Sequence, residues 1–181
     1  MRRRSSGPFQ PQADGSFRIN LPPDVRELLV HLFGELRDVL TQADTTDPAL
    51  RRLFPAAYHD DPERDAEYHE LMRSELVASR LTAISRVVEV LGDTTSGSAD
   101  RLEAGDMDLF LQSLNAVRLL LGTMLDVTED EDGDDRGNPD DPDDPVAAQA
   151  HLYSYLGWLL EGAVAAAMAV GPDGGNNRKP R

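Results

Sequence analysis

Three glutamates at helical spacing are the first side chains in this chain that could do chemistry. Glu63, Glu67 and Glu70 fall at positions i, i+4 and i+7, which places their carboxylates on one face of a helix. With His59 or His69 they could hold a metal ion, because helical bundles do house metals between carboxylates. Such sites use a Glu-x-x-His pair, and the sequence contains none. We therefore interpret the glutamates as a solvated face and predict no metal and no cofactor.

A strongly acidic stretch could bind calcium through carboxylate oxygens. Between Asp126 and Asp144 there are eleven acidic residues and one basic residue, so the stretch carries −10 of the formal net charge of −15. An EF-hand loop needs an oxygen ligand at its first position and a bidentate glutamate at its last. Thr128 and Pro139 occupy those two positions, so the match fails at both ends. We predict a disordered, solvated acidic loop over residues 127–144, with weak divalent binding as the alternative.

Nucleophilic catalysis has no support in the sequence. There is no Gly-x-Ser-x-Gly motif and no glycine-rich phosphate loop, and the four histidines are scattered along the chain. We predict no catalytic residues and no enzymatic activity.

Arg118 and Glu161 are charged residues within largely apolar segments. Arg118 lies in the run 114–122, and Glu161 is the only charge between Leu152 and Val170. A buried guanidinium without a carboxylate partner is costly. We predict a structural ion pair between the two, joining the last two helices, with a role in a binding site as the alternative.

A basic and aromatic group stands out in the short segment that connects two helices. It consists of Arg51, Arg52, Phe54 and Tyr58. Arg and Tyr are enriched in binding hot spots, and connecting segments often carry function. These residues are our candidate surface for a protein partner. The alternative is that Leu53, Phe54 and Tyr58 form a lid on the helical bundle while the arginines pair with local carboxylates.

The charge balance and the absence of cysteine exclude several classes of function. The chain has 18 Lys and Arg against 33 Asp and Glu, and DNA binding depends on basic residues, so we expect no direct nucleic-acid partner. Without cysteine there is no disulfide, no Cys-ligated zinc and no thiol redox centre. The N-terminal arginines precede a polar segment rather than an apolar one, which does not fit a secretion signal. Residues 152–170 contain Glu161 and many alanines, so we expect a buried helix, no membrane span and a cytoplasmic protein.

The apolar periodicity predicts four long helices, each with one stripe of apolar residues that faces a core. They are expected to begin near Asp24, Asp61, Asp106 and Asp144, and a short helix is expected at Pro48. In the helix that begins near Asp61, the predicted core line is Val77, Leu81, Ile84, Val88 and Leu91.

The elements together predict an all-α fold. It is a single helical bundle of four main helices plus a short helix, with a short N-terminal β-hairpin at the turn Asp14–Gly15 between Phe9 and the run 17–19, and no other strand. The expected organisation is a disordered arm or hairpin strand over 1–16, one helical domain over 17–126 and 145–171, the acidic loop, and a disordered tail over 172–181.

Several sequence strings are similar to a known family. They are residues 47–62, Glu67 with Tyr68, residues 114–122, and the segments 17–29 and 155–161. They resemble the actinobacterial domain-of-unknown-function family that includes the transcription regulator AosR. The resemblance implies a cytoplasmic, helical, non-enzymatic regulator that acts on transcription through protein contacts. Thiol-based sensing is not carried over, because this chain has no cysteine.

Two hypotheses about function follow. The first is a non-enzymatic regulatory protein that binds a transcription or proteolysis component, with self-association as a further option. The alternative is a small-ligand or metal-binding helical bundle with hydrolytic potential. A closed core with an exposed apolar patch would favour the first. A polar internal cavity lined by Glu63, Glu67, Glu70 and His69 would favour the second.

Overall fold

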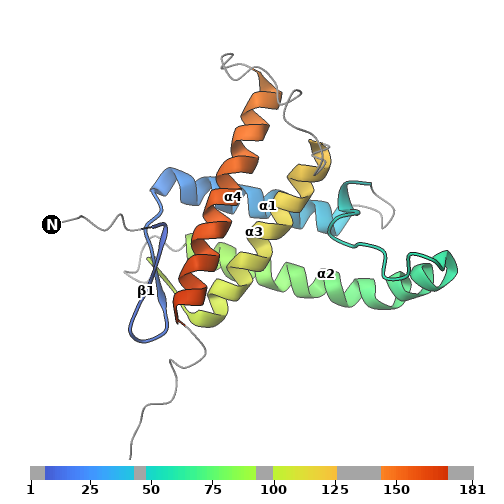
Figure 1. The fold of residues 1–181 in the computed structure, drawn as a ribbon, viewed down its shortest axis with the longest axis horizontal. Coiled ribbons are helices and arrows are strands. Elements are labelled where there is room, and N and C mark those ends of the chain that lie inside the picture. Colours follow the sequence, from blue (N-terminus) through green and yellow to red (C-terminus); the bar gives the residue numbers. More distant parts are fainter. Residues whose placement is uncertain (1–6, 43–47, 93–99, 126–143, 171–181) are drawn as a thin grey trace, which may run out of the picture.

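The fold is a bundle of four α-helices with a small sheet at one side, as a computed structural model shows for residues 7–42, 48–92, 100–125 and 144–170 (Figure 1). The helices are α1 (Pro23–Gln42), η1 (a 3-10 turn, Pro48–Leu50), α2 (Pro62–Gly92), α3 (Ala104–Met124) and α4 (Pro145–Val170). The strands are β1 (Phe9–Pro11), β2 (Phe17–Ile19) and β3 (Arg101–Leu102). The predicted helical bundle is confirmed, including the short helix at Pro48.

Two helices begin at the Asp-Pro pairs that the sequence indicates. The side chain of Asp61 accepts a hydrogen bond from the backbone N–H of Arg64 at 3.1 Å, and that of Asp144 accepts one from Val146 at 2.8 Å. Each aspartate thereby pairs a backbone donor that the first helical turn leaves without a partner. The proline that follows has no N–H to satisfy, so both starts are encoded locally.

The N-terminal hairpin forms as predicted, and a third strand joins it. β1 and β2 are antiparallel, and Gly15 takes a φ of 87°, a left-handed conformation that favours glycine in a tight turn. β2 also pairs with β3, which comes after α1, η1 and α2 in the chain and was not expected. The predicted helical fold class is therefore confirmed, and the one correction is that the hairpin is part of a three-stranded antiparallel sheet. A strand of two residues has no alternation that a sequence pattern could reveal.

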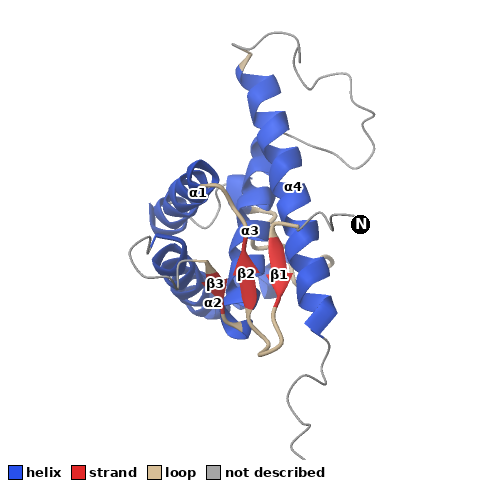
Figure 2. Cartoon of the chain, turned by 90° about the vertical axis from the view of Figure 1, so that its left-hand side faces the viewer, coloured by secondary structure: helices blue, strands red, loops and turns tan. Residues whose placement is uncertain are grey.

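The core forms around α3, which packs against the other three long helices. Phe110 of α3 is fully buried, and its ring contacts those of Phe9 and Phe33 at centroid distances of 5.1 and 6.2 Å. β1 lies beside α4, so the sheet covers the side of the core between α4 and α3 (Figure 2). The ring contacts of Phe9, Phe33 and Phe110 thus connect the hairpin, α1 and α3.

Most of α2 lies outside this core. Its buried residues are Ala83, Ile84, Val87 and Leu91, all in the last third of the helix. Of the predicted core line, Val77, Leu81 and Val88 are only half-buried. The N-terminal part of α2 extends beyond the other helices together with the connecting segment (Figure 1); we call residues 62–82, the first two thirds of α2, the arm.

α4 carries apolar side chains both in the core and at the surface. By length and composition alone, α4 is the one helix among the described residues that could cross a membrane. Leu156, Leu159 and Ala163 on one of its faces are fully buried against the bundle, whereas Trp158 and Met168 are 52% and 77% exposed.

The predicted acidic loop over 127–144 and the calcium-loop pattern within it lie outside the described residues except for Asp144, as does the predicted tail over 172–181.

Candidate functional site

The four residues predicted as a partner surface lie between η1 and α2. Their segment is anchored by its leucines, since Leu50 and Leu53 are 1% and 2% exposed. Phe54 is half-buried, and Tyr58 is 40% exposed. Arg51 is exposed and Arg52 half-buried. Leu53 therefore covers the bundle as the lid interpretation supposed, while the remaining side chains stay accessible.

Phe54 is held between two arginines of α2. The guanidinium carbons of Arg73 and Arg80 each lie 5.4 Å from the centre of its ring. Arg80 also donates a hydrogen bond from Nη2 to the carbonyl oxygen of Leu53 at 3.0 Å. Sequence reasoning missed both arginines. The available signal was their spacing of seven residues, which places them on one face of a helix.

Tyr58 is fixed to the beginning of α2. The backbone N–H groups of Ala57 and Tyr58 donate to the Asp65 carboxylate at 2.7 and 3.0 Å, and these bonds lower the pKa of Asp65, the bond from Tyr58 most strongly. The guanidinium carbon of Arg64 lies 5.0 Å from the Tyr58 ring centre, and the ring of Tyr68 meets it edge-on at 6.1 Å. One face of the arm is thus covered by the connecting segment.

The predicted ion pair between Arg118 and Glu161 does not form. No contact within 4.0 Å joins their charged groups, although both residues are described. The Arg118 guanidinium lies over the ring of Tyr153, 4.8 Å from its centre, while Glu161 is exposed. Gly157 lies next to this guanidinium, and a Cβ there would make an ordinary van der Waals contact with Arg118 Nη2 at 3.5 Å. Stacking on an aromatic face avoids the desolvation of a second charge that a buried ion pair requires.

Arg52, two residues before Phe54 in the chain, lies near Tyr153 of this pair. A Cβ at Gly122 of α3 would lie 2.8 Å from Arg52 Nη1 and 3.2 Å from Cε2 of Tyr153. Arg52 and Tyr153 therefore both lie against Gly122, where an added Cβ would require the Arg52 side chain to shift. We call the resulting group the arginine cluster; its members are Arg52, Arg73, Arg80 and Arg118 with the rings of Phe54 and Tyr153.

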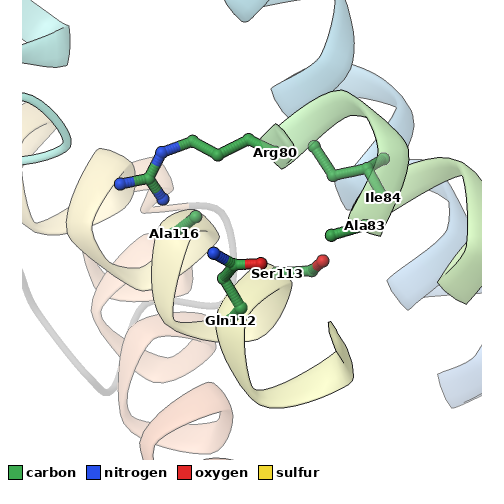
Figure 3. Close-up of a pocket in the computed structure, with 6 residues that line it drawn as sticks. All are labelled: Arg80, Ala83, Ile84, Gln112, Ser113 and Ala116. Carbon is green, nitrogen blue, oxygen red and sulfur yellow. The ribbon is translucent and has the colours of Figure 1, made fainter. Parts of the chain in front are cut away.

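The cluster contains polar atoms without hydrogen-bond partners. Arg80 Nε, Arg118 Nε and the Ser113 hydroxyl are buried and unpaired among the described residues. Arg80 reaches from α2 across to α3, where Gln112 and Ser113 line a small recess with it (Figure 3). Burial also lowers the pKa of Arg80. Buried donors are nearly always paired in native proteins, so these unpaired atoms distinguish the cluster from the rest of the described chain, although the recess itself has no room for a water molecule.

The carboxylates considered for a metal site do not converge. Glu63, Glu67 and Glu70 are all exposed on the arm. His69 Nε2 lies 3.6 Å from Asp65 Oδ2. Within the described ranges, no group of three or more metal-ligating side chains is placed to hold an ion. The glutamates therefore do not line an internal cavity, which was the arrangement that would have favoured the alternative hypothesis.

The fold and this surface define a small helical-bundle protein that presents arginines stacked on aromatic rings. The chain belongs to the DUF2017 family, a domain of unknown function, whose family model matches residues 4–167. It is 26% identical over 180 residues to the protein named oxidative stress regulator AosR, from Mycobacterium bovis and from two strains of Mycobacterium tuberculosis. That likeness covers 80% of this chain and 79% of the relative. No solved structure matches the chain significantly. The family predicted from the sequence strings is thereby confirmed.

Proposed function

We propose that this protein is a non-enzymatic regulator that binds another protein through the arm of α2 and the connecting segment 51–60. The observation that carries the proposal is that the arm contains no buried residue. Leu71, a large apolar side chain near its middle, is 69% exposed. The arm is therefore built for contact beyond this chain rather than for its own core.

The arm is a long helical segment with little packing of its own. Its 62–82 span corresponds to a helix of about 30 Å. Helices in proteins owe most of their stability to the packing of an apolar face, and here the packing comes from one side only, through Phe54 and Tyr58. The opposite side, with Leu71 and the exposed glutamates, is open to a partner.

The name of the relative supports a regulatory role. A relative at 26% identity is named as an oxidative stress regulator, and this chain lacks the cysteines that a thiol sensor would need. The proposal is therefore regulation through protein contact, with a component of transcription or proteolysis as the partner and the cytoplasm as the location. Direct binding to nucleic acid is disfavoured by the net charge of −15.

Affinity capture with matched surface variants tests the proposal. Wild type, Leu71→Glu and Met168→Glu would each be used to capture partners from native lysate, and the captured protein would then be purified and titrated directly. Both substituted residues are highly exposed, so neither change should disturb the fold. We expect Leu71→Glu to lose the partner and Met168→Glu to keep it. Loss with Met168→Glu alone would instead place the binding surface on α4 and contradict the proposal.

A further inference from the structure

We propose that the arginine cluster binds the carboxylates of an acidic segment in the partner protein. This inference rests on the proposed function and specifies the chemistry of the partner. Arg73, Arg80 and Arg118 have no carboxylate partner among the described residues, their guanidinium groups lie over aromatic rings, and the charge of the whole chain selects the kind of anion.

Three arginines of the cluster, Arg73, Arg80 and Arg118, differ in their partners from four other arginines of this protein. Arg26, Arg37, Arg86 and Arg101 each have an Asp or Glu oxygen within 4.0 Å. Arg73, Arg80 and Arg118 have none among the described residues, although the chain holds 33 acidic residues. Their contacts are aromatic rings and, for Arg80, one carbonyl oxygen.

The N–H donors of these three arginines are therefore largely unused within the part of the chain that the structure describes. A guanidinium carries five N–H donors at the edge of its plane and no acceptor. The contact of Arg80 with Leu53 is the one hydrogen bond from Arg73, Arg80 or Arg118 to another described residue. The Nε atoms of Arg80 and Arg118 are, in addition, buried without a partner. A carboxylate is the group that suits such an edge, because its two oxygens match the guanidinium fork.

The aromatic rings hold these edges in place before any partner arrives. Arg73 and Arg80 stack on Phe54, and Arg118 stacks on Tyr153. Stacking uses the faces of the guanidinium groups and leaves their edges for hydrogen bonds. A side chain that is already ordered loses less conformational entropy on binding, so the cluster is organised in advance for its ligand.

The charge of the whole chain favours a short acidic peptide over a nucleic acid. At physiological salt, charges separated by more than about 8 Å are largely screened. A peptide with a few carboxylates would interact mainly with the local arginines. A nucleic-acid strand continues past the cluster and would meet a protein with a net charge of −15.

Fluorescence anisotropy with defined probes tests the inference. The probe is a short labelled peptide of alternating Glu and Ser; its controls are the same peptide with Gln in place of Glu and a labelled single-stranded RNA of uridines. We expect saturable binding of the acidic peptide that weakens as salt increases, and no binding of either control. The acidic stretch 126–143 of the chain itself could compete, so the same titration would be run on a variant with Ser or Asn at its Asp and Glu positions.

Neutral substitutions assign the binding to the cluster. Arg73→Gln with Arg80→Gln should weaken the acidic peptide about tenfold, and Arg118→Gln should also weaken it. Arg73→Lys with Arg80→Lys keeps the charge but loses the planar fork, so an intermediate loss is expected. Arg37→Gln on α1 is the matched control, because that arginine is exposed and already paired with Asp38, and it should bind as wild type. Arg73→Gln alone, which loses a single ring contact, is the variant to use if the double change unfolds.

The outcomes separate this inference from the proposed function. If neither wild type nor the variant with the neutral stretch binds the acidic peptide, or if the Gln peptide or the RNA binds equally well, the inference is wrong. The same holds if the arginine variants bind as wild type. If a captured partner is lost with Leu71→Glu but retained with Arg73→Gln and Arg80→Gln, the arm is the binding surface and only the carboxylate assignment fails.

Discussion

The guanidinium of Arg118 lies over the ring of Tyr153, with 4.8 Å between the guanidinium carbon and the ring centre, and Glu161 on the same helix as Tyr153 takes no part. This arrangement joins α3 to α4 through a cation and an aromatic face. It also leaves the arginine without a neutralising carboxylate among the described residues. The stability of the α3–α4 contact should therefore depend on Tyr153 and be nearly indifferent to Glu161.

The first prediction compares these two residues. Tyr153→Leu keeps most of the apolar volume but removes the aromatic face, so it should lower the free energy of unfolding by about 1 kcal/mol. Glu161→Gln should change that free energy by less than about 0.5 kcal/mol, because the side chain is exposed. Urea unfolding of both variants gives the two values. If Glu161→Gln lowers the free energy of unfolding as much as Tyr153→Leu does, then Glu161 does pair with Arg118 in solution and the prediction is wrong.

The second prediction concerns two helical glycines with different surroundings. A Cβ at Gly162 of α4 would lie 2.7 Å from Cγ of Pro8, a rigid and buried ring, whereas a Cβ at Gly34 of α1 meets nothing within 4 Å. Gly34→Ala should raise the free energy of unfolding by about 0.5–1 kcal/mol through helix propensity. Gly162→Ala should lower it by about 1–3 kcal/mol through overpacking. The two melting temperatures would move in opposite directions; a rise in both would mean that Pro8 yields easily.

The third prediction is an acid-sensitive hairpin. The hydrogen bond from the Ser16 hydroxyl to Asp14 is the main cause that lowers the pKa of this carboxyl from 3.8 to about 2, and the Ser16 backbone N–H contributes next. Because the folded-state pKa is depressed, the stabilisation is complete above pH 3.8 and is lost as the pH falls towards 2.

Unfolding measured between pH 5 and pH 2 should show this loss in the wild type and a weaker pH dependence in Asp14→Asn. Asp108→Asn, a change at an exposed residue of α3, is the control and should keep the wild-type profile. Direct titration of the Asp14 carboxyl by NMR measures the pKa itself. An unshifted midpoint near 3.8 would show that the Ser16 bonds are not maintained in solution.

The fourth prediction tests how α4 is bound to the bundle. Leu159 is fully buried and the adjacent Trp158 is 52% exposed. Leu159→Ala should lower the free energy of unfolding by about 2–5 kcal/mol, since it removes buried methyl groups and leaves a cavity. Trp158→Ser should cost about 1 kcal/mol or less, because it loses mainly the ring contact with Tyr155. Similar small costs for both variants would mean that α4 does not share the core of the other helices.

The sequence pointed to one part of the candidate site and gave no sign of another. Phe54 and Tyr58 were recognised because aromatic and basic residues are concentrated in a short connecting segment. Arg73 and Arg80 were missed because exposed arginines on a helix are common and nothing local distinguishes these two. Their role depends on Phe54, which is about 20 residues away in the chain and reaches them only in the folded state.

The amino-acid sequence by itself determined where the helices begin, which residues form the apolar stripe around Phe110 and where the hairpin turns at Gly15. Each of these depends on residues a few positions apart, through caps, proline restraints, periodicity and a left-handed turn. The pairing of β3 and the choice of Tyr153 over Glu161 as the contact of Arg118 were decided by the tertiary structure. Both depend on which surfaces meet when separate elements pack, and that is settled by the combined shape and desolvation of many residues rather than by any local pattern.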